Sequence, residues 1–453
     1  MAGLDPIQGT GSKIVGEIVC KFGGTSLADA SCIRRAEAII RSDARRRFVV
    51  PSAPGKRTPE DRKITDLLYA WFNIAREGLD ASEPRDLVRQ RYEQLVADLG
   101  VALDMGALIA EIEAKLPACT TPDYMASRGE YLNGRIIAAL LGANFVDPAE
   151  CIRFDEEGNL DESSYADLAA RLSGEGLFVV PGFYGALPNG EIKTFSRGGS
   201  DITGAIVARA VNAEVYENWS DVSGFLMADP RIVDNPREIR EITYQELREL
   251  SYMGATVLHD EAIFPVRKVG IPINLRNTWK PEHPGTRIVS TRQSSQPVCG
   301  IAGRAGFSMI NIEKAFMNKE RGFGLRVLRV LDDYNIGWEH MPTGIDTLSL
   351  IVRDEELANY GKAVIEAIRG TCNPDEVTLV PGLAIIATVG TGMNHHVGVA
   401  ARLCSAIAEA GVNLRVIDQG SSEMNIIIGV EERDLHTAVR ALYNAFAEWD
   451  AGK

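Results

Sequence analysis

The chain has 453 residues, which is enough for two or three domains with a core each. Its 45% apolar and 24% charged residues are ordinary for a globular protein, and its net charge of −14 argues against nucleic acid or an anionic membrane as the main partner. No apolar run reaches the roughly 18 residues that a membrane span needs, and the start lacks a signal-peptide core. We therefore expect a cytoplasmic protein that uses neither a membrane nor a nucleic acid.

The cysteine and histidine residues give no metal-binding pattern. His395 and His396 are adjacent and point apart in a helix or a strand, and no carboxylate or cysteine completes a set with them. We expect no metal site made of protein ligands alone, and we expect small buried thiols rather than disulfides or zinc ligands. The cysteines are Cys20, Cys32, Cys119, Cys151, Cys299, Cys372 and Cys404.

The most informative stretch is a glycine-rich turn near the start of the chain. Residues 14–20 are β-branched and apolar, which predicts a buried strand, and residues 30–40 have the apolar spacing of a helix. Lys21, Gly23 and Gly24 lie between them, where glycine amides, a helix N-terminus and a lysine favour a bound phosphate. The spacing matches neither the P-loop nor G-x-G-x-x-G, so a plain strand-to-helix turn remains an alternative.

A second strand and a helical region follow this turn. Arg41 and residues 45–47 are expected to close the first helix, whose C-terminal dipole favours cations. Residues 48–55 predict a buried strand that brings Ser52 to the same sheet edge as Lys21. From about residue 64 to 116 the pattern is helical, and Thr65 at its entrance is the one candidate there for contact with a ligand.

Another helix is expected to open at residues 127–130, which read Ser-Arg-Gly-Glu. Ser127 and Glu130 have the spacing of a capping box, and that structural explanation alone accounts for both residues. A functional role for Glu130 needs support from elsewhere.

A second glycine-rich loop follows strands expected at residues 145–146 and 177–183 and a hairpin turn at 187–190. It reads Arg-Gly-Gly-Ser-Asp over residues 197–201 and again opens a helix. Two such helix starts, with Lys21 on one and Arg197 on the other, suggest phosphoryl transfer between two anions.

The remainder of the first domain contains further strands and turns. Residues 214–219 predict a strand that runs into a turn at Ser220 and Asp221, and a helix and a strand are expected at 244–253 and 273–276. Arg231 lies in an Asp-Pro-Arg turn, where contact with phosphate and a surface salt bridge are equally open explanations.

The end of the chain repeats itself. Residues 322–331 and 398–407 match at an offset of about 76 residues, and strands at 347–352 and 425–430 correspond in the same way. Each copy reads as strand, helix, strand, strand, helix, strand, which is a ferredoxin-like arrangement. Two copies indicate a paired sensor or an oligomer interface.

The sequences KFGGTS, SRGEYLNGR, SRGGSDITG and WSDVSGFLMADPR, followed by the repeats, resemble the aspartokinases in this order. The resemblance implies an α/β protein with an amino-acid-kinase fold, a mostly parallel sheet between helix layers, followed by two ferredoxin-like ACT domains. A strand near residues 298–302 is expected to complete the second ACT domain. The expected divisions are a tail at 1–13, a catalytic domain at 14–295, and ACT domains at 296–378 and 379–453.

The resemblance implies transfer of the γ-phosphoryl group of MgATP to the side chain of L-aspartate, which gives 4-phospho-L-aspartate. This is the first step toward lysine, threonine and methionine. An aspartate carboxylate, with a reference pKa near 3.9, is already ionised at neutral pH, so the reaction needs no strong base. The harder problem is repulsion between two anions, which cations, glycine-loop amides and Mg²⁺ bound through ATP must offset.

The resemblance also implies residue roles. Lys21 is expected to stabilise the transferring phosphoryl group, and Asp201 to hold Lys21 in place. The expected substrate-binding residues are Ser52, Thr65, Glu130, Arg197, Gly198 and Ser200. The expected nucleotide-binding residues are Lys21, Gly23, Gly24, Gly199, Ser220, Asp221 and Arg231.

Two positions depart from the family pattern. Leu226 stands where well-known members have a tyrosine, and Thr256 stands where they have a lysine, for which Lys268 is a candidate substitute.

The tandem ACT domains imply an amino-acid sensor, with lysine or threonine as the usual effector, and a homodimer or higher homo-oligomer. Glu320 stands where lysine-sensitive relatives have a small hydroxyl residue, so the identity of the effector stays open. The expected effector positions are Met317, Gly322, Gly324 and Thr347.

Two other classes of function remain. A kinase acting on glutamate or acetylglutamate explains the glycine loops but not residues 127–130 or the repeats. A catalytically silent sensor explains the repeats, although it has no need for both Lys21 and Asp201.

Overall fold

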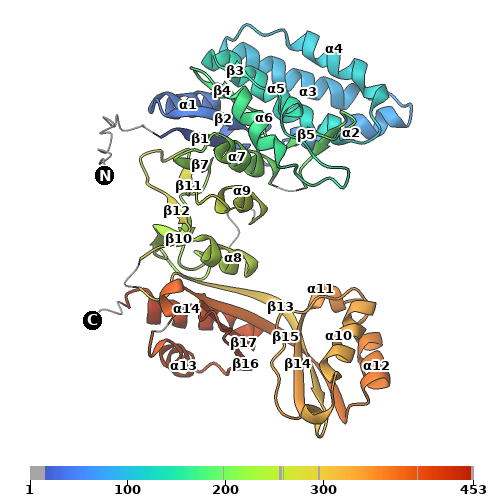
Figure 1. Ribbon diagram of the computed structural model, residues 1–453, viewed down its shortest axis with the longest axis vertical. Coiled ribbons are helices and arrows are strands. Elements are labelled where there is room, and N and C mark those ends of the chain that lie inside the picture. Colours follow the sequence, from blue (N-terminus) through green and yellow to red (C-terminus); the bar gives the residue numbers. More distant parts are fainter. Residues whose placement is uncertain are drawn as a thin grey trace, which may run out of the picture. The chain divides into compact units, whose positions relative to one another are not determined.

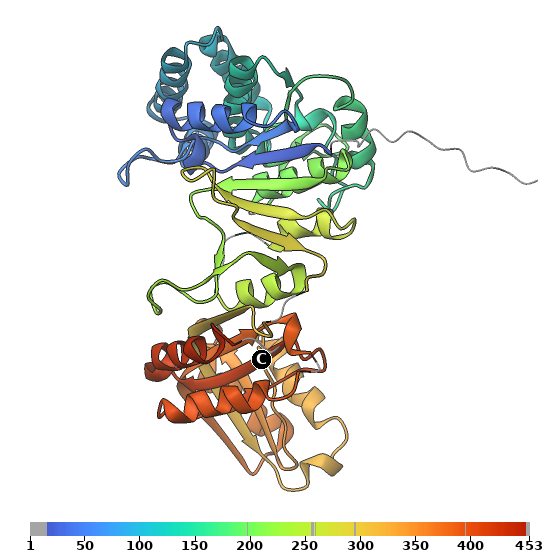
Figure 2. The same ribbon diagram turned by 90° about the vertical axis from the view of Figure 1, so that its left-hand side faces the viewer.

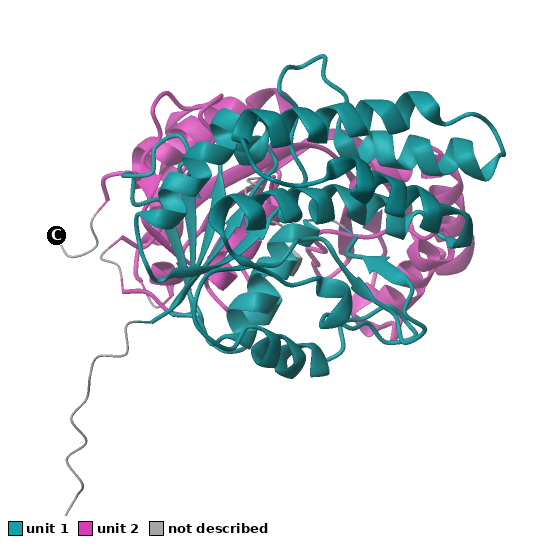
Figure 3. Cartoon of the chain, turned by 90° about the horizontal axis from the view of Figure 1, so that it is seen from above, with its two compact units in different colours: residues 1–224, 257–290 teal, residues 225–256, 291–453 magenta. Residues whose placement is uncertain are grey.

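The computed structural model describes residues 16–196, 198–254, 258, 260–293, 296–394 and 396–449. The chain divides into two compact units, which Figure 3 colours separately: residues 1–224 with 257–290 form unit 1, and residues 225–256 with 291–453 form unit 2. The sequence placed 225–256 with the catalytic domain, whereas these residues belong to unit 2; the domain boundaries themselves stay a prediction. Among the described helices, none is long and apolar enough to cross a membrane.

Unit 1 is built on a mostly parallel sheet, in which its strands lie in the order β12-β11-β7-β1-β2-β4-β3 (Figures 1 and 2). Only β12 is antiparallel to its neighbour β11. The carboxyl ends of the parallel strands therefore meet at one edge, where ligands of open α/β sheets bind. The strands are β1 (Ile18–Phe22), β2 (Arg46–Pro51), β3 (Asn144–Phe145), β4 (Phe178–Val179), β7 (Val215–Ser220), β11 (Ile273–Asn277) and β12 (Thr286–Val289).

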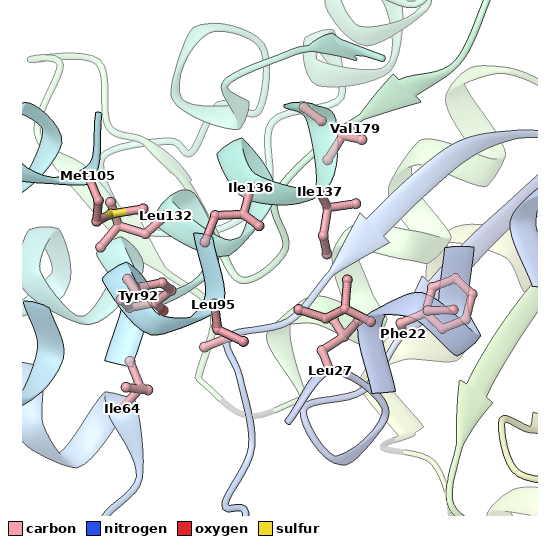
Figure 4. Close-up of a cluster of buried hydrophobic side chains, with 14 of the residues drawn as sticks. Phe22, Leu27, Ile64, Tyr92, Leu95, Met105, Leu132, Ile136, Ile137 and Val179 are labelled. Carbon is pink, nitrogen blue, oxygen red and sulfur yellow. The ribbon is translucent and has the colours of Figure 1, made fainter. Parts of the chain in front are cut away.

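Helices cover both faces of this sheet. One face carries a large apolar core with α1 (Ala30–Arg41), α2 (Ile64–Arg76), α3 (Ser82–Leu99), α4 (Met105–Lys115) and α5 (Asp123–Leu141). The other face carries α7 (Gly199–Ala210), with α6 (Ser163–Arg171) and α9 (Phe264–Arg267) against it and the hairpin of β5 (Tyr184–Ala186) and β6 (Ile192–Thr194) nearby. Figure 4 shows part of the core, where Ile137 of α5 lies near Val179 of β4.

Successive side chains of β1 point to opposite faces of the sheet, and this alternation decides which layer of helices each side chain contacts. Cys20 and Phe22 enter the core with α1 and α5, so Lys21 between them points to the opposite face, where α7 packs on β1, β2 and β7. Lys21 is directly opposite Asn218 in the parallel register of β1 and β7. A single lysine is thereby placed under the first turn of α7.

The prediction that residues 45–47 close a helix is wrong for Arg46 and Arg47. The helix α1 ends at Arg41, and both arginines belong to strand β2. Arg46 is buried and forms an ion pair with Glu217 (2.8 Å), which also pairs with Arg276 (3.4 Å). The two guanidinium groups lie over the ring of Trp219, at 5.3 and 4.7 Å from its centroid.

Unit 2 combines a short excursion from the middle of the chain with the C-terminal region. The excursion contains β8 (Phe225–Leu226), β9 (Glu238–Ile239), β10 (Glu241–Thr243) and α8 (Tyr244–Tyr252). A capping box formed by Thr243 and Glu246 starts α8, and the Glu246 carboxylate also accepts hydrogen bonds from Arg292 and from the backbone of Thr391. This buried carboxylate joins the excursion to the C-terminal sheet.

The two C-terminal repeats share one sheet, in the order β14-β13-β15-β17-β16. The strands are β13 (Gly300–Glu313), β14 (Thr347–Arg353), β15 (Glu376–Val389), β16 (Val416–Asp418) and β17 (Asn425–Glu431). The helices α10 (Phe323–Asp333), α11 (Asp354–Leu357) and α12 (Gly361–Cys372) gather near β14, and α13 (Val399–Glu409) and α14 (Leu435–Phe446) near β16 and β17 (Figure 1).

Two long strands serve both repeats, where the sequence had suggested a separate set of strands for each. Residues 300–305 of β13 pair with 384–389 of β15 on the side of the second repeat, and 307–313 pair with β14 of the first. The strand expected near 298–302 thus begins at Gly300 and continues into the first repeat. Where the second repeat has β16, the first has only isolated bridges at His340 and Thr343.

We expect Glu217→Ala to destabilise unit 1 strongly, because Arg46 and Arg276 would be left buried beside Trp219 without a counter-charge. Breaking a buried ion pair from one side costs about 3–5 kcal/mol, which lowers the midpoint of thermal unfolding by roughly 6 °C or more. Glu93→Ala, which removes an exposed pair with Arg89 on α3, is the control and should shift the midpoint by less than about 2 °C. Equal shifts in the two variants would contradict this.

Candidate active site

The centre of the site is a buried ion pair between Lys21 of β1 and Asp201 in the first turn of α7. The Lys21 Nζ and Asp201 Oδ1 atoms are 2.5 Å apart, and Lys21 is only 7% exposed. Asp201 also accepts a hydrogen bond from Asn218 (2.8 Å). Low exposure to water strengthens the attraction within such a pair, so the Lys21 side chain is held in a fixed place.

Two glycine-bearing loops touch each other beside Lys21. The amide of Gly55 donates to the carbonyl of Gly24 (2.8 Å), and a Cβ atom on Gly55 would lie 2.6 Å from the Gly24 carbonyl. Arg91 of α3 is buried behind them and donates to the carbonyls of Ala28 (2.5 Å) and Gly55 (2.9 Å). Sequence reasoning missed Arg91, because nothing in its local pattern separates it from a surface arginine of a helix.

The prediction that Ser127 and Glu130 cap a helix is wrong. Helix α5 begins at Asp123, so both residues lie inside it, and the Ser127 hydroxyl donates to the carbonyl of Tyr124 (2.6 Å). Glu130 is instead a buried carboxyl group whose Oε2 has no hydrogen-bond partner among the described residues. The structure thus removes the structural explanation that competed with a binding role for Glu130.

Burial raises the pKa of Glu130 to about 7, against the opposing effects of the Ala53 amide and the charge of Lys21. Gly129, beside Glu130 on α5, packs on the loop after β2, because a Cβ atom on Gly129 would lie 2.9 Å from the Ala53 Cβ atom. One turn later on α5, Asn133 donates to the carbonyl of Ser52 (2.7 Å) and was also missed. The loop that carries Ser52 and the part of α5 around Glu130 therefore lie against each other. The roles of Ser52 and Glu130 in substrate binding stay predictions.

The second glycine-rich loop starts α7 with three small residues. Gly198 has a φ of +60°, which favours glycine, and a Cβ atom on Gly199 would lie 2.5 Å from the ring of Phe183. Ser200 packs closely on Gly182. Arg197, one of the predicted substrate-binding residues, lies outside the described residues.

Phe183 is a further residue that the sequence did not indicate. It has a φ of +85°, unusual for an aromatic residue, while its amide donates to the Thr203 hydroxyl (3.0 Å) and its carbonyl accepts from Phe195 (2.9 Å). Strained backbone held by several contacts is typical of functional sites.

The predicted nucleotide-side residues Ser220 and Asp221 lie at the end of β7, at the same sheet edge as Lys21. Trp219 is opposite Phe22 in the register, and its carbonyl accepts from the amide of Gly23 (3.0 Å). Asn277 at the end of β11 donates to the carbonyl of Asp221 (3.3 Å). The edge is therefore continuous from β1 to β11.

Other predicted residues are less closely tied to this centre. Thr65 lies in the first turn of α2, next to Ile64, whose side chain borders Gly129. Lys268 forms an ion pair with Glu162 (3.0 Å). Thr256, where the family lysine is missing, lies outside the described residues.

Arg231 and Leu226 belong to unit 2. Arg231 is highly exposed and forms an ion pair with Asp229 (2.6 Å), which is the surface salt bridge that the sequence left open. Its nucleotide role stays a prediction.

The predicted effector residues come together around one loop of unit 2. Met317 is buried, Gly322 has a φ of +75° at the start of α10, and Gly324 follows it. Thr347 begins β14 opposite Glu313, next to the loop. Glu320 in the same loop forms ion pairs with Lys314 (3.2 Å) and Arg326.

In unit 1, the arrangement places Lys21 between two sets of polar groups. On one side are the Ser52 loop and the Glu130 carboxyl group, and on the other are the ends of β7 and β11. Glycine amides and the N-terminus of α7 add partial positive charge. Such a centre stabilises negative charge that moves from one side to the other.

Family comparisons agree with this architecture. The model of the amino acid kinase family matches residues 16–277, and a model of the ACT domain matches residues 386–446. Aspartokinase 3 of Bacillus subtilis is 40% identical over 448 residues, which cover 94% of this chain and 98% of that protein.

Solved structures give the same result. The aspartate kinase of Clostridium acetobutylicum, an allosteric enzyme, has a TM-score of 0.91 and 47% identity, covering 95% of this chain and 100% of that one. Two structures of aspartokinase III of Escherichia coli also match, each covering 95% of this chain and 100% of that one. Its R-state complex with aspartate and ADP has a TM-score of 0.71 and 27% identity. Its T-state complex with lysine and aspartate has a TM-score of 0.75 and 26% identity. The chain therefore belongs to the amino acid kinase family and, within it, to the aspartokinases.

Proposed function

We propose that this aspartokinase transfers the γ-phosphoryl group of ATP to the side-chain carboxylate of L-aspartate, giving ADP and 4-phospho-L-aspartate. The observation that carries the proposal is the buried Lys21–Asp201 pair at the edge between the substrate and nucleotide sides. The aspartate and ADP held by the related E. coli enzyme support both ligands. The product is an activated carboxyl group, which suits the first step of a biosynthetic route to the aspartate-family amino acids.

In this reaction Lys21 stabilises the charge of the transferring phosphoryl group. The acceptor carboxylate is ionised at neutral pH, so no proton has to be removed. Asp201 holds the lysine ammonium group in place, in keeping with their 2.5 Å contact. The bond from the γ-phosphorus to the bridging oxygen of ADP breaks, and a bond to a carboxylate oxygen of aspartate forms.

On the substrate side, Glu130 provides a carboxylate for the ammonium group of aspartate. Its unpaired Oε2 in a buried setting supports this, because an ionised carboxylate there needs a positive partner. Ser52 and Thr65 supply hydroxyl groups, Gly198 and Ser200 line the loop, and Arg197 clamps a substrate carboxylate in two-point contact.

On the nucleotide side, Gly23, Gly24 and Gly199 allow ATP to approach the main chain closely, and Ser220, Asp221 and Arg231 complete the nucleotide-binding residues. The described residues contain no group of three or more His, Cys, Asp or Glu side chains placed to hold a metal. We propose that Mg²⁺ is bound mainly through ATP oxygens and water, and Asp221 is an exposed carboxylate directly after β7 at this edge. Such an ion offsets part of the phosphate charge.

For regulation, we propose that lysine or threonine binds at the loop formed by Met317, Gly322, Gly324 and Thr347. The lysine in the T-state of the E. coli relative supports an amino-acid effector. We also propose that the protein forms a homo-oligomer through unit 2, whose exposed apolar side chains include Leu325 (71%), Ile345 (70%) and Val397 (93%).

The test is ATP- and Mg²⁺-dependent phosphorylation trapped with hydroxylamine, run with L-aspartate, L-glutamate and N-acetyl-L-glutamate. We expect the hydroxamate of aspartate alone. The proposed substrate would be contradicted if a hydroxamate formed faster from L-glutamate or N-acetyl-L-glutamate than from L-aspartate. It would also be contradicted if none of the three acceptors gave a hydroxamate.

We expect Lys21→Ala to lower kcat by at least about 100-fold, since a preorganised charge at the transferring group would be lost. The same assay measures kcat. Lys115→Ala removes a lysine paired with Glu111 on the surface of α4 and should retain wild-type turnover. Near-normal turnover in Lys21→Ala would overturn the role of Lys21.

We expect kcat/KM for aspartate to fall as the pH drops below about 7. Burial raises the pKa of Glu130 to about 7, so the group is a carboxylate above this value and neutral below it, and only the carboxylate attracts the substrate ammonium. Glu130→Gln should raise the KM for aspartate about tenfold or more and abolish this titration. The same titration in both proteins would assign it to another group.

We expect Gly322→Ala to weaken feedback inhibition, because its φ of +75° is strained for alanine and the effector loop must then change. The concentration of lysine or threonine needed for half-inhibition should rise about fivefold or more. Turnover without effector should stay close to wild type. Unchanged inhibition by whichever amino acid suppresses the wild type would separate this loop from effector binding.

A further inference from the structure

Asn218 is a buried amide directly beside the catalytic ion pair, and neither sequence nor family resemblance pointed to it. It lies in the middle of β7, is 3% exposed, and is opposite Lys21 in the register of the two parallel strands. Neighbouring residues in register project from the same face of a sheet, so Asn218 and Lys21 both point to the first turn of α7.

The two side chains meet at the same oxygen atom. Asn218 Nδ2 donates to Asp201 Oδ1 at 2.8 Å, and Lys21 Nζ lies 2.5 Å from that atom. The carboxylate is therefore held by two donors from two adjacent strands. With one donor removed, rotation of the Asp201 side chain would carry the lysine ammonium group with it.

The backbone of Asp201 is anchored from the same strand. Tyr216 donates its hydroxyl hydrogen to the Asp201 carbonyl (3.1 Å) and accepts from Asn218 (3.2 Å). Gly204 allows this contact, because a Cβ atom there would lie 2.5 Å from the Tyr216 hydroxyl oxygen. Strand β7 thus fixes both the main chain and the side chain of Asp201.

We propose that Asn218 is a positioning residue for phosphoryl transfer: its amide fixes the Asp201 carboxylate, and through it the ammonium group of Lys21. This inference deepens the proposed function and rests on it. A neutral donor suits the position, because a second cation would compete with Lys21 for Asp201, whereas an ionised acid would repel Asp201.

The first test replaces the amide by an apolar side chain of similar size, Asn218→Leu. We expect kcat to fall about 10- to 100-fold, while the KM values for aspartate and ATP change less than about threefold, because the misplaced group acts in the transition state. The matched control is Asn425→Leu, which removes a 2.7 Å amide-to-carboxylate hydrogen bond between β17 and Glu249 of α8, away from Lys21. It should keep wild-type kcat.

The second test is Asn218→Asp. The introduced carboxyl group would face Asp201 from α7, Lys21 from β1 and the Tyr216 hydroxyl from β7. Two facing carboxyl groups share a proton at lower pH, and the protonated form donates to Asp201 as the amide does. We expect the ratio of variant to wild-type kcat to fall as the pH rises from about 6 to 9, whereas the ratio for Asn218→Leu should stay flat.

A third readout does not depend on turnover. Labelling of Lys21 by an amine-selective reagent, followed by peptide mass spectrometry, should be several-fold faster in Asn218→Leu than in wild type and Asn425→Leu. Wild-type kcat in Asn218→Leu, or unchanged labelling, would overturn the proposal. Failure of the wild type to phosphorylate aspartate would instead refute the proposed function, and the labelling rates would still decide whether Asn218 positions Lys21.

Discussion

The structure of the site depends on one ion pair, between Lys21 and Asp201, buried in a chain whose net charge is −14. In an acidic protein that must bring a carboxylate next to a triphosphate, a cation has to be local and fixed. Strand alternation in β1 turns Lys21 away from the apolar core and toward α7, whose first turn carries Asp201. The parallel sheet then brings the remaining groups to the same edge.

The residues around the Lys21–Asp201 pair explain how the short loops at Gly24 and Gly55 can form part of a ligand-binding site. Gly24 and Gly55 pack main chain against main chain, and buried Arg91 holds the loop carbonyls from behind, so the amides beside Lys21 are preorganised. The Glu130 carboxyl group is buried, its Oε2 atom has no hydrogen-bond partner among the described residues, and its pKa is raised to about 7, so its ionised form is costly for the free protein. In the proposed binding mode, a substrate ammonium group relieves that cost, and the site would therefore favour an amino acid as its substrate.

Local sequence patterns predicted the strands, the glycine turns and α7. The apolar periodicity of a strand, a glycine-rich turn and the start of a helix all depend on residues that are neighbours in the sequence. One failure of these patterns was local: the capping box at Ser127 was wrong because α5 already begins at Asp123. The other failures lie where long-range contacts decide, and Arg46 was misplaced because its partner Glu217 is distant in sequence. Arg91, Asn133 and Asn218 were missed for the same reason: only the folded sheet shows what each side chain contacts. The sheet shared by the C-terminal repeats likewise requires pairing between distant strands.

The most direct measurement is a crystal structure with aspartate, ADP, Mg²⁺ and a fluoride mimic of the transferring phosphoryl group. The account predicts that Lys21 Nζ lies within hydrogen-bond distance of the mimic, while Asp201 remains paired with Lys21 and does not touch the acceptor carboxylate. An Asp201 oxygen in hydrogen-bond contact with that carboxylate, or a Lys21 ammonium group turned away from the mimic, would contradict it.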